Sequence, residues 1–363
     1  MLQFKKICTW VLAGALVFSV AGCQPQTQPQ AQSEEPTAEQ ERFDAFIEKE
    51  FVDTMESDYT TAHVYLQDPE SFGVDPDKIS VSLGTRMDEE SQQASLDAFE
   101  ATCEEFRTFD RDELSAEQQD IYDIFDYQVS LSESLSDERF DYYAPMFESI
   151  SGLHYQLPTL FADWQLRNEE DVQDLITLMS DVRPYVDSAL EYTRTQEEKG
   201  LLMLDLDSVI SYCEGIVESG EDSAVLQAMN DSIAALELGE EKTAQYQEQL
   251  RTAFSDSFLS AYQDILDTMR ELQSSGENNE QGLAQFEYGK EYYALLLQQS
   301  IGSNKTPEEV KAMMEEAFNE HLQQLQMYAM AYPEETEEVL SQDLPKTGYT
   351  SYDEILQDRK SVV

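Results

Sequence analysis

The sequence predicts an all-α protein, built as a multi-helix array with at most one or two short strands. Two observations carry this prediction. Apolar residues recur at helical spacing along most of the chain, and clear helix-start signals precede several of these stretches. Strand signals are sparse: residues 79–83 alternate in polarity but end directly at Gly84, so we interpret them as a loop or one short strand. No fixed-period repeat occurs, which argues against a solenoid.

The first helices are predicted from aromatic spacing and a capping signal. Ordered structure should begin near Glu41, because Phe43, Phe46, Ile47 and Phe51 follow it at helical spacing. Farther along, Ser115 and Gln118 match a capping box, in which each side chain bonds the backbone N–H of the other residue. The apolar face of the helix that follows consists of Ile121, Tyr122, Phe125 and Val129.

A long helix is predicted from Asn168 onward. Three acidic residues occupy its first turn, where the helix dipole favours negative charge. Its buried stripe should contain Val172, Leu175, Ile176, Met179 and Val182. Pro184 falls inside the pattern and should kink or interrupt the helix, which Gly200 ends.

A further helix is predicted to start at Thr306. Thr306 is the expected N-cap, Pro307 fits the first helical position, and Glu309 completes a capping box. The apolar face of this helix comprises Met313, Met314, Ala317, Phe318, Leu322 and Leu325.

Residues 1–22 have the features of an export signal. Lys5 and Lys6 precede an apolar run that is too short for a bilayer core of ~30 Å, which takes about 20 helical residues. Small residues then lead to Cys23, which resembles the lipobox of bacterial lipoproteins, where the thiol is acylated and becomes the first mature residue. We therefore expect an extracytoplasmic protein, lipid-anchored to the cell membrane through Cys23.

Composition divides the chain into four predicted segments. The lipoprotein signal peptide covers residues 1–22, and a disordered tether rich in Gln, Pro and Ser covers residues 23–40. A helical domain should span 41–277. The Ser-, Gly- and Asn-rich stretch 274–282 is the best candidate for an internal boundary, so a second helical segment should span 283–363.

Charge restricts the partners. The chain has 75 acidic and 22 basic side chains and a formal net charge of −53. Such a surface repels phosphate backbones and anionic lipid headgroups, which excludes nucleic-acid binding and electrostatic membrane adsorption. No EF-hand loop is found among the acidic residues, so we interpret them as solvated helix faces.

Two cysteines belong to the predicted mature body. Cys103 and Cys213 could form one disulfide in an oxidising compartment, or both could be buried thiols. We favour buried thiols, because each cysteine lies within a helical apolar pattern.

Catalytic motifs are missing from the sequence. A zincin helix needs two histidines four residues apart, whereas His63, His154 and His321 are scattered. No Gly-rich phosphate loop and no Gly-x-Ser-x-Gly elbow is found. We therefore assign no catalytic residue, no metal ligand and no cofactor to this chain.

Two unusual runs could line a ligand cleft. Residues 151–158 place His, Tyr and Gln between Gly and Pro, and residues 282–293 are rich in tyrosine. Aromatic rings beside hydrogen-bonding groups suit peptide or sugar recognition. The candidate cleft residues are His154, Tyr155, Trp164, Arg167, Tyr288 and Tyr292. The alternatives are an interhelical connection with His154 satisfied by a carboxylate, and a packed helix in which Gly289 allows a close crossing.

Several short pieces together carry a family resemblance. They are residues 43–46, 63–73, 117–122, 151–154, 157–158, 182–185, 289–293 and 306–309. In this order and spacing they resemble the N-terminal part of the bacterial domain-of-unknown-function 885 family, predicted zinc metallopeptidase-like proteins that are often lipoproteins.

The resemblance implies an activity whose residues this chain does not have. In full-length relatives, a His-Glu segment followed by Pro-Gly-His-His is expected to hold zinc and the general base, and no segment here matches it. We therefore expect a shortened gene product equivalent to the non-catalytic helical portion, inactive alone. The alternatives are a peptide- or solute-binding lipoprotein, or one part of a split zinc peptidase.

Overall fold

The computed structural model describes residues 35–341 and confirms the all-α prediction. These residues form helices joined by turns, with no strand among them, and residues 79–83 are a loop. The export signal, Cys23, most of the tether and the last part of the predicted segment 283–363 lie outside the described residues. The chain divides into two compact units, residues 1–300 and 301–363, and each is described by itself.

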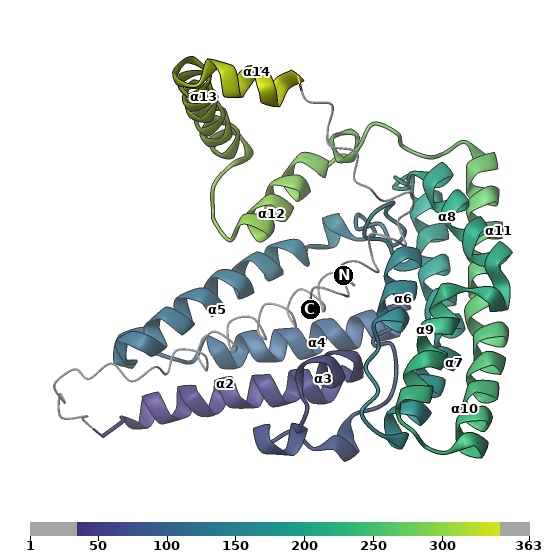
Figure 1. Ribbon diagram of the computed structural model, residues 1–363. Helices are drawn as coiled ribbons and strands as arrows, with labels where there is room; N and C mark the ends of the chain where they lie inside the picture. The colour runs from purple at the N-terminus through teal and green to yellow at the C-terminus, as the bar shows by residue number, and fades with distance from the viewer. Residues whose placement is uncertain (1–34, 342–363) are drawn as a thin grey trace. The chain divides into compact units, whose positions relative to one another are not determined.

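Three N-terminal helices pack around an aromatic core. They are α2 (Ala38–Ser57), α4 (Glu89–Phe106) and α5 (Ala116–Leu135), which lie side by side in Figure 1. The core consists of Phe43, Phe46, Cys103, Phe106, Phe109, Leu114, Phe125 and Val129. The predicted Ser115 capping box is present at the start of α5. Helix α2 begins three residues earlier than expected, because Thr37 and Gln40 form a second capping box.

A larger helical bundle follows and holds the main hydrophobic core. Its helices are α6 (Leu153–Ala162), α7 (Glu169–Glu198), α8 (Leu206–Ser219), α9 (Ala224–Ala235), α10 (Glu240–Ala253) and α11 (Ser260–Ser275). Asn168 caps α7 as predicted, and Gly200 follows its end with φ of +68°. The apolar stripe of α7 is buried, with Val172, Leu175 and Val182 fully enclosed.

Helix α7 runs without a break through Pro184, and a serine from another helix accounts for this. Proline has no N–H to donate to the carbonyl of Ser180, four residues earlier. The hydroxyl of Ser257 donates to that carbonyl at 3.1 Å and accepts from the Arg183 N–H at 2.9 Å. Ser257 lies in a π-helical turn, Phe254–Leu259, that joins α10 to α11. Continuation of the helix therefore depends on a contact between segments distant in sequence.

Carboxylates on one face of α7 bind the short helix α3 (Tyr59–Tyr65) and the loop that follows it. The Tyr59 hydroxyl donates to Asp174 at 2.7 Å. Asp181 accepts from the Leu83 N–H at 2.9 Å and pairs with Arg86. These carboxylates fix the N-terminal segment to the bundle through hydrogen bonds, whereas the N-terminal core itself is aromatic.

Residues 283–300 pack within the first unit. Phe286 and Tyr292 join Phe140 and Tyr143 in a small aromatic cluster that includes α12 (Gly289–Ile301). A side chain at Gly289 would meet the Leu283 carbonyl oxygen at 1.6 Å, so only glycine fits at this position. The approaching group is the backbone of a preceding turn.

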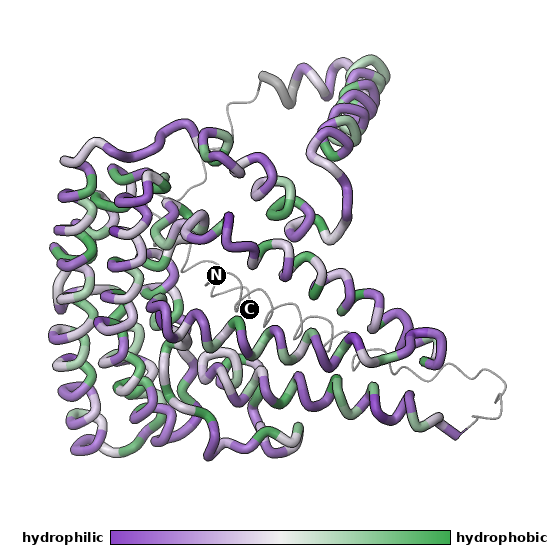
Figure 2. Tube along the Cα trace, turned by 180° about the vertical axis from the view of Figure 1, so that it is seen from behind, coloured by the Kyte–Doolittle hydropathy of each residue, from purple (hydrophilic) through white to green (hydrophobic). Residues whose placement is uncertain are grey.

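The second unit is described through α13 (Pro307–Ala331) and α14 (Pro333–Ser341). The predicted capping box of Thr306 and Glu309 starts α13. The predicted apolar face exists, and Figure 2 shows hydrophobic and hydrophilic residues alternating along the helix. No described residue of α13 is buried: Met314 is 68%, Phe318 67% and Leu325 65% exposed.

Candidate functional site

His154 lies near the start of α6 and is buried. Its ring packs against Phe147 and Tyr212, at centroid distances of 6.1 and 5.4 Å. Its Nδ1 atom has no hydrogen-bond partner among the described residues, and burial lowers the pKa of His154 to about 4. The side chain is therefore neutral at physiological pH. The neighbouring Tyr155 is 45% exposed and packs on Tyr212.

Trp164 and Arg167 form part of a polar and aromatic junction around His63. The His63 and Trp164 rings stack with centroids 4.3 Å apart. His63 Nε2 lies 2.8 Å from the Gln165 carbonyl oxygen, and Arg167 donates to the His63 carbonyl at 2.7 Å. Trp164 is 4% exposed. These contacts join α3 to the segment before α7, a structural role for both predicted residues.

Tyr288 and Tyr292, the remaining predicted cleft residues, belong to the aromatic cluster around Phe140 and Tyr143. Tyr292 is buried against Phe140 and Tyr143, and burial raises the pKa of Tyr292 to about 12. Tyr288 lies at the edge of this cluster, where the Arg139 guanidinium stacks on its ring at 5.2 Å. Neither of the two cavities described below is lined by any of the six predicted cleft residues.

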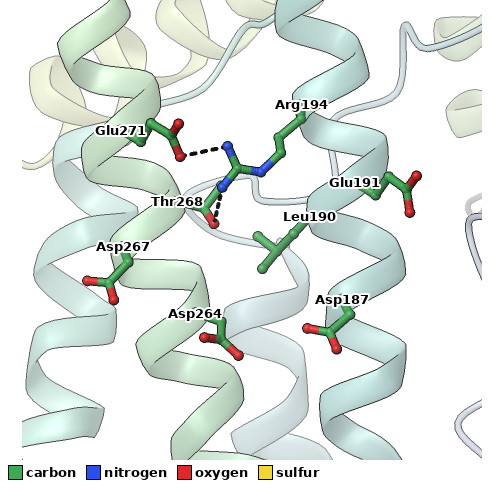
Figure 3. Close-up of a pocket in the computed structure, with 8 residues that line it drawn as sticks. All are labelled: Asp187, Leu190, Glu191, Arg194, Asp264, Asp267, Thr268 and Glu271. Carbon is green, nitrogen blue, oxygen red and sulfur yellow. Dashed lines mark hydrogen bonds and ion pairs between the residues drawn. The ribbon is translucent and has the colours of Figure 1, made fainter.

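A groove along α7 contains the first of these cavities. It lies between α7 and α11 (Figure 3). Its volume is about 450 Å³. It is lined by Asp187, Leu190, Glu191 and Arg194 from α7 and by Asp264, Asp267, Thr268 and Glu271 from α11. Arg194 spans the upper end of the cavity, donating to Glu271 at 2.7 Å and to Thr268 at 3.2 Å.

A second cavity of about 540 Å³ continues along the same helix toward its N-terminus. Its lining is Ile176, Ser180, Arg183 and Pro184 from α7, Glu248, Gln249, Thr252 and Ala253 from α10, and Asp256 and Ser257 from the π-helical turn. The α7 residues of both cavities recur every three or four positions, so they share one helix face. Arg183 of the second cavity pairs with Asp264 of the first at 3.1 Å.

The groove is strongly acidic. Five carboxylates line the first cavity and two line the second, against one arginine in each. Asp187 and Asp264 face each other in Figure 3. Partial desolvation raises the pKa of Asp187, and the negative charge of Asp264 adds to the shift. The Arg183 guanidinium, which pairs with Asp264, offsets part of this shift.

Sequence reasoning missed this groove because its charged residues look like an ordinary solvated helix face. The only sequence signal is that polar residues recur at helical spacing in two segments. These are residues 176–194 of α7 and residues 248–271, which run from α10 through the π-helical turn into α11. That two such faces lie opposite each other is a tertiary fact. Pro184 inside a helical pattern was noticed, but its partner Ser257 gave no sequence signal.

Among residues 35–341 no group of three or more His, Cys, Asp or Glu side chains is arranged to hold a metal ion. His321 is exposed on α13 in the second unit.

Cys103 and Cys213 lie buried in different hydrophobic clusters, and no disulfide joins them. Burial raises the pKa of the Cys213 thiol to about 12, which leaves it protonated. Within the described part of the chain, no helix is both long and apolar enough to cross a membrane.

Comparisons with known proteins identify the family. The search of curated proteins finds no match. The crystal structure described as "the putative lipoprotein from Colwellia psychrerythraea" matches with a TM-score of 0.67 at 15% identity, covering 82% of this chain and 52% of that chain. At this identity the likeness shows the fold alone, and our chain spans about half the length of that solved chain. The family model described as "Bacterial protein of unknown function (DUF885)" matches residues 70–357, most of the sequence. The chain therefore belongs to the DUF885 family of bacterial proteins.

Proposed function

We propose that this protein is a lipid-anchored, extracytoplasmic helical lipoprotein that corresponds to the non-catalytic helical portion of a zinc peptidase-like protein. By itself it hydrolyses no peptide. The anchor is the lipid on Cys23, which follows the apolar signal and small residues of a lipobox. A fold shared with a protein described as a lipoprotein supports this assignment.

The observation that carries the second part of the proposal is how the histidines are used. His63 is engaged by a backbone carbonyl and a stacked Trp164, and His154 is enclosed by aromatic rings. His321 lies in the second unit. A catalytic zinc needs three protein ligands around one open position. The described residues therefore do not fit the zinc ion that the family resemblance implies for full-length relatives.

Zinc binding and hydrolysis can be measured together on the full-length chain in detergent. The chain would be incubated with zinc, desalted, analysed for bound metal, and assayed against a peptide mixture. We expect less than stoichiometric zinc and no metal-dependent cleavage. Stoichiometric zinc that is lost in His63→Ala or His154→Ala, together with cleavage, would overturn the proposal.

The anchor has its own test. Labelled palmitate fed to expressing cells should be incorporated into the wild-type chain, and the chain should sediment with membranes. Cys23→Ser should abolish both, whereas Cys213→Ser, which changes a buried thiol far from the signal, should keep the label. Label that persists in Cys23→Ser would contradict acylation at this residue.

A second candidate function is favoured by the exposed apolar face of α13. That face is rich in Met, Phe, Leu and Tyr, and large exposed apolar patches mark interaction sites. The solved lipoprotein has about as much chain again outside the matched part. On this reading, the chain is one part of a split zinc peptidase, and α13 binds a separate polypeptide that carries the His-Glu and Pro-Gly-His-His segments.

The split-peptidase hypothesis can be tested on the neighbouring DNA and by co-expression. The coding DNA downstream must specify such a segment, and co-expression must give zinc-dependent cleavage that neither polypeptide shows alone. Phe318→Glu, on the apolar face of α13, should abolish co-purification, whereas Glu316→Gln on the same helix should preserve it. A downstream region without this segment removes the reading.

A further inference from the structure

The α7 groove has the dimensions of a binding site for an extended ligand. The α7 residues that line the two cavities run from Ile176 to Arg194, and eighteen helical steps of about 1.5 Å place them along about 27 Å of the helix. Both cavities are open to solvent, and their volumes are about 450 and 540 Å³. The cavity centres are about ten helical residues apart, or about 15 Å, which an extended chain covers in about five residues.

The floor and the walls of the groove differ in chemistry. Leu190 is 6% exposed and forms an apolar floor beside the facing carboxylates of Asp187 and Asp264. This combination suits a side chain with an alkyl stem and a cationic head. The second cavity has the apolar surfaces of Pro184 and Ala253, with hydrogen-bonding groups along its edge. It suits an apolar side chain next to a peptide backbone.

The cations already present do not neutralise the groove. Arg183 is paired with Asp264, and Arg194 with Glu271. Asp187 and Asp256 form no ion pair within the described part of the chain, and Arg183 offsets only part of the shift in the pKa of Asp187. A ligand must therefore bring its own positive charge to match the lining.

The groove has a fixed centre. Ser257 bonds both the Ser180 carbonyl and the Arg183 N–H, which ties the π-helical turn to α7 in the lining of the second cavity. π-helical turns are rare and occur often at functional sites. With its backbone held in this way, the groove is formed before a ligand arrives, which lowers the entropy cost of binding.

From the length of the groove, its floor and its acidic lining, we infer that it binds an extended peptide, with a lysine or arginine head beside Asp187 and Asp264 and an apolar side chain against Ile176 in the second cavity. This inference goes beyond the anchoring and the lack of hydrolysis proposed above and depends on neither. A peptide is favoured over a simple polyamine because the second cavity offers Gln249, Thr252 and apolar surface, which a polyamine would not use.

Binding can be measured by fluorescence anisotropy on the full-length chain in detergent. The probe is a labelled eight-residue Ser/Gly peptide with lysine near one end and leucine five residues away. We expect saturable binding that weakens at least tenfold when lysine is replaced by glutamine, or when the peptide is cut to four residues. Raising the salt concentration should also weaken binding.

Matched variants tie the signal to the groove. Asp187→Asn should weaken binding about tenfold, whereas Glu198→Gln, an equal charge change on an exposed residue of α7 outside the groove, should leave it unchanged. Equal binding of the lysine and glutamine peptides, an unaffected Asp187→Asn variant, or no binding would each overturn the inference. Spermidine competing as strongly as the peptide would assign the groove to polyamines and contradict the peptide class.

Discussion

Helices α7 and α13 have the same kind of sequence and opposite environments. Both start with a side-chain cap, both carry acidic residues in the first turn, and both have an apolar stripe at helical spacing. In α7 the stripe is enclosed by the bundle, with Leu175 fully buried. In α13 the stripe is exposed along its whole length, with Leu325 at 65%. An apolar stripe therefore predicts a helix and the face it would bury, but not what covers that face.

The largest expected difference between the two helices is in core packing. Leu175→Ala in α7 should lower the free energy of unfolding by about 2–5 kcal/mol, because it leaves a cavity in a closed core. The same change at Leu325 in α13 should cost about 0.5 kcal/mol or less. Urea unfolding of both variants, followed by circular dichroism, measures this. Similar losses would mean that α13 is as well packed as α7.

The Pro184 contact tests whether α7 depends on its neighbours. Ser257→Ala removes the hydroxyl that donates to the Ser180 carbonyl and accepts from the Arg183 N–H, at a cost of about 1–3 kcal/mol. Ser180→Ala is the matched control, since its hydroxyl bonds only a carbonyl of its own helix. A Ser257→Ala variant as stable as the control would show that α7 crosses Pro184 unaided.

The stability of the protein should depend on pH through the buried His154 but not in the same way through His321, which is exposed on α13. The pKa of His154 is about 4 in the folded protein and about 6.5 when unfolded. The unfolded chain therefore binds this proton first as pH falls, and stability is lost between pH 6.5 and 4. From pH 7 to pH 5 the loss from this group should be about 2 kcal/mol.

Unfolding free energies at both pH values, in wild type and in His154→Phe, isolate this loss. The wild type should lose about 2 kcal/mol more than the variant over this range. His321→Gln in α13 is the matched control for replacing a histidine, and its stability at pH 7 should equal that of wild type. Parallel pH curves for wild type and His154→Phe would show that His154 is not buried in the neutral form.

The smallest expected effects are at the helix caps. Ser115→Ala should cost about 1 kcal/mol of global stability, because α5 packs into the aromatic core. Thr306→Ala should lower only the helicity of α13, since no described residue of that helix is buried. Circular dichroism and urea unfolding separate the two results. A global loss of stability in Thr306→Ala would place α13 within the cooperative fold.

Local signals were sufficient to predict most helices, and the reason is physical. Capping boxes at Ser115 and Thr306 act within one helical turn, so sequence alone specifies them. The all-α class and the separation of Cys103 from Cys213 followed in the same way from apolar spacing. The Thr37 capping box was overlooked in a polar tether, which placed the start of α2 three residues late.

The groove could not be predicted, because it depends on contacts between distant segments. Asp187 and Asp264 are ordinary solvated residues in sequence, and only the packing of α7 against α11 brings them together. The predicted cleft residues were chosen for unusual local composition. In the structure Trp164 stacks on His63, and Tyr292 packs in an aromatic cluster.

Hydrogen exchange with mass spectrometry on the full-length chain tests the contrast between α7 and α13 most directly. Amides in a closed core exchange only on global or sub-global unfolding, whereas those of an uncovered helix exchange through local opening. We predict protection for hours across residues 172–190 of α7 and exchange within minutes across residues 310–328 of α13. Equal, slow exchange in the two helices would contradict the claim that the apolar face of α13 is uncovered.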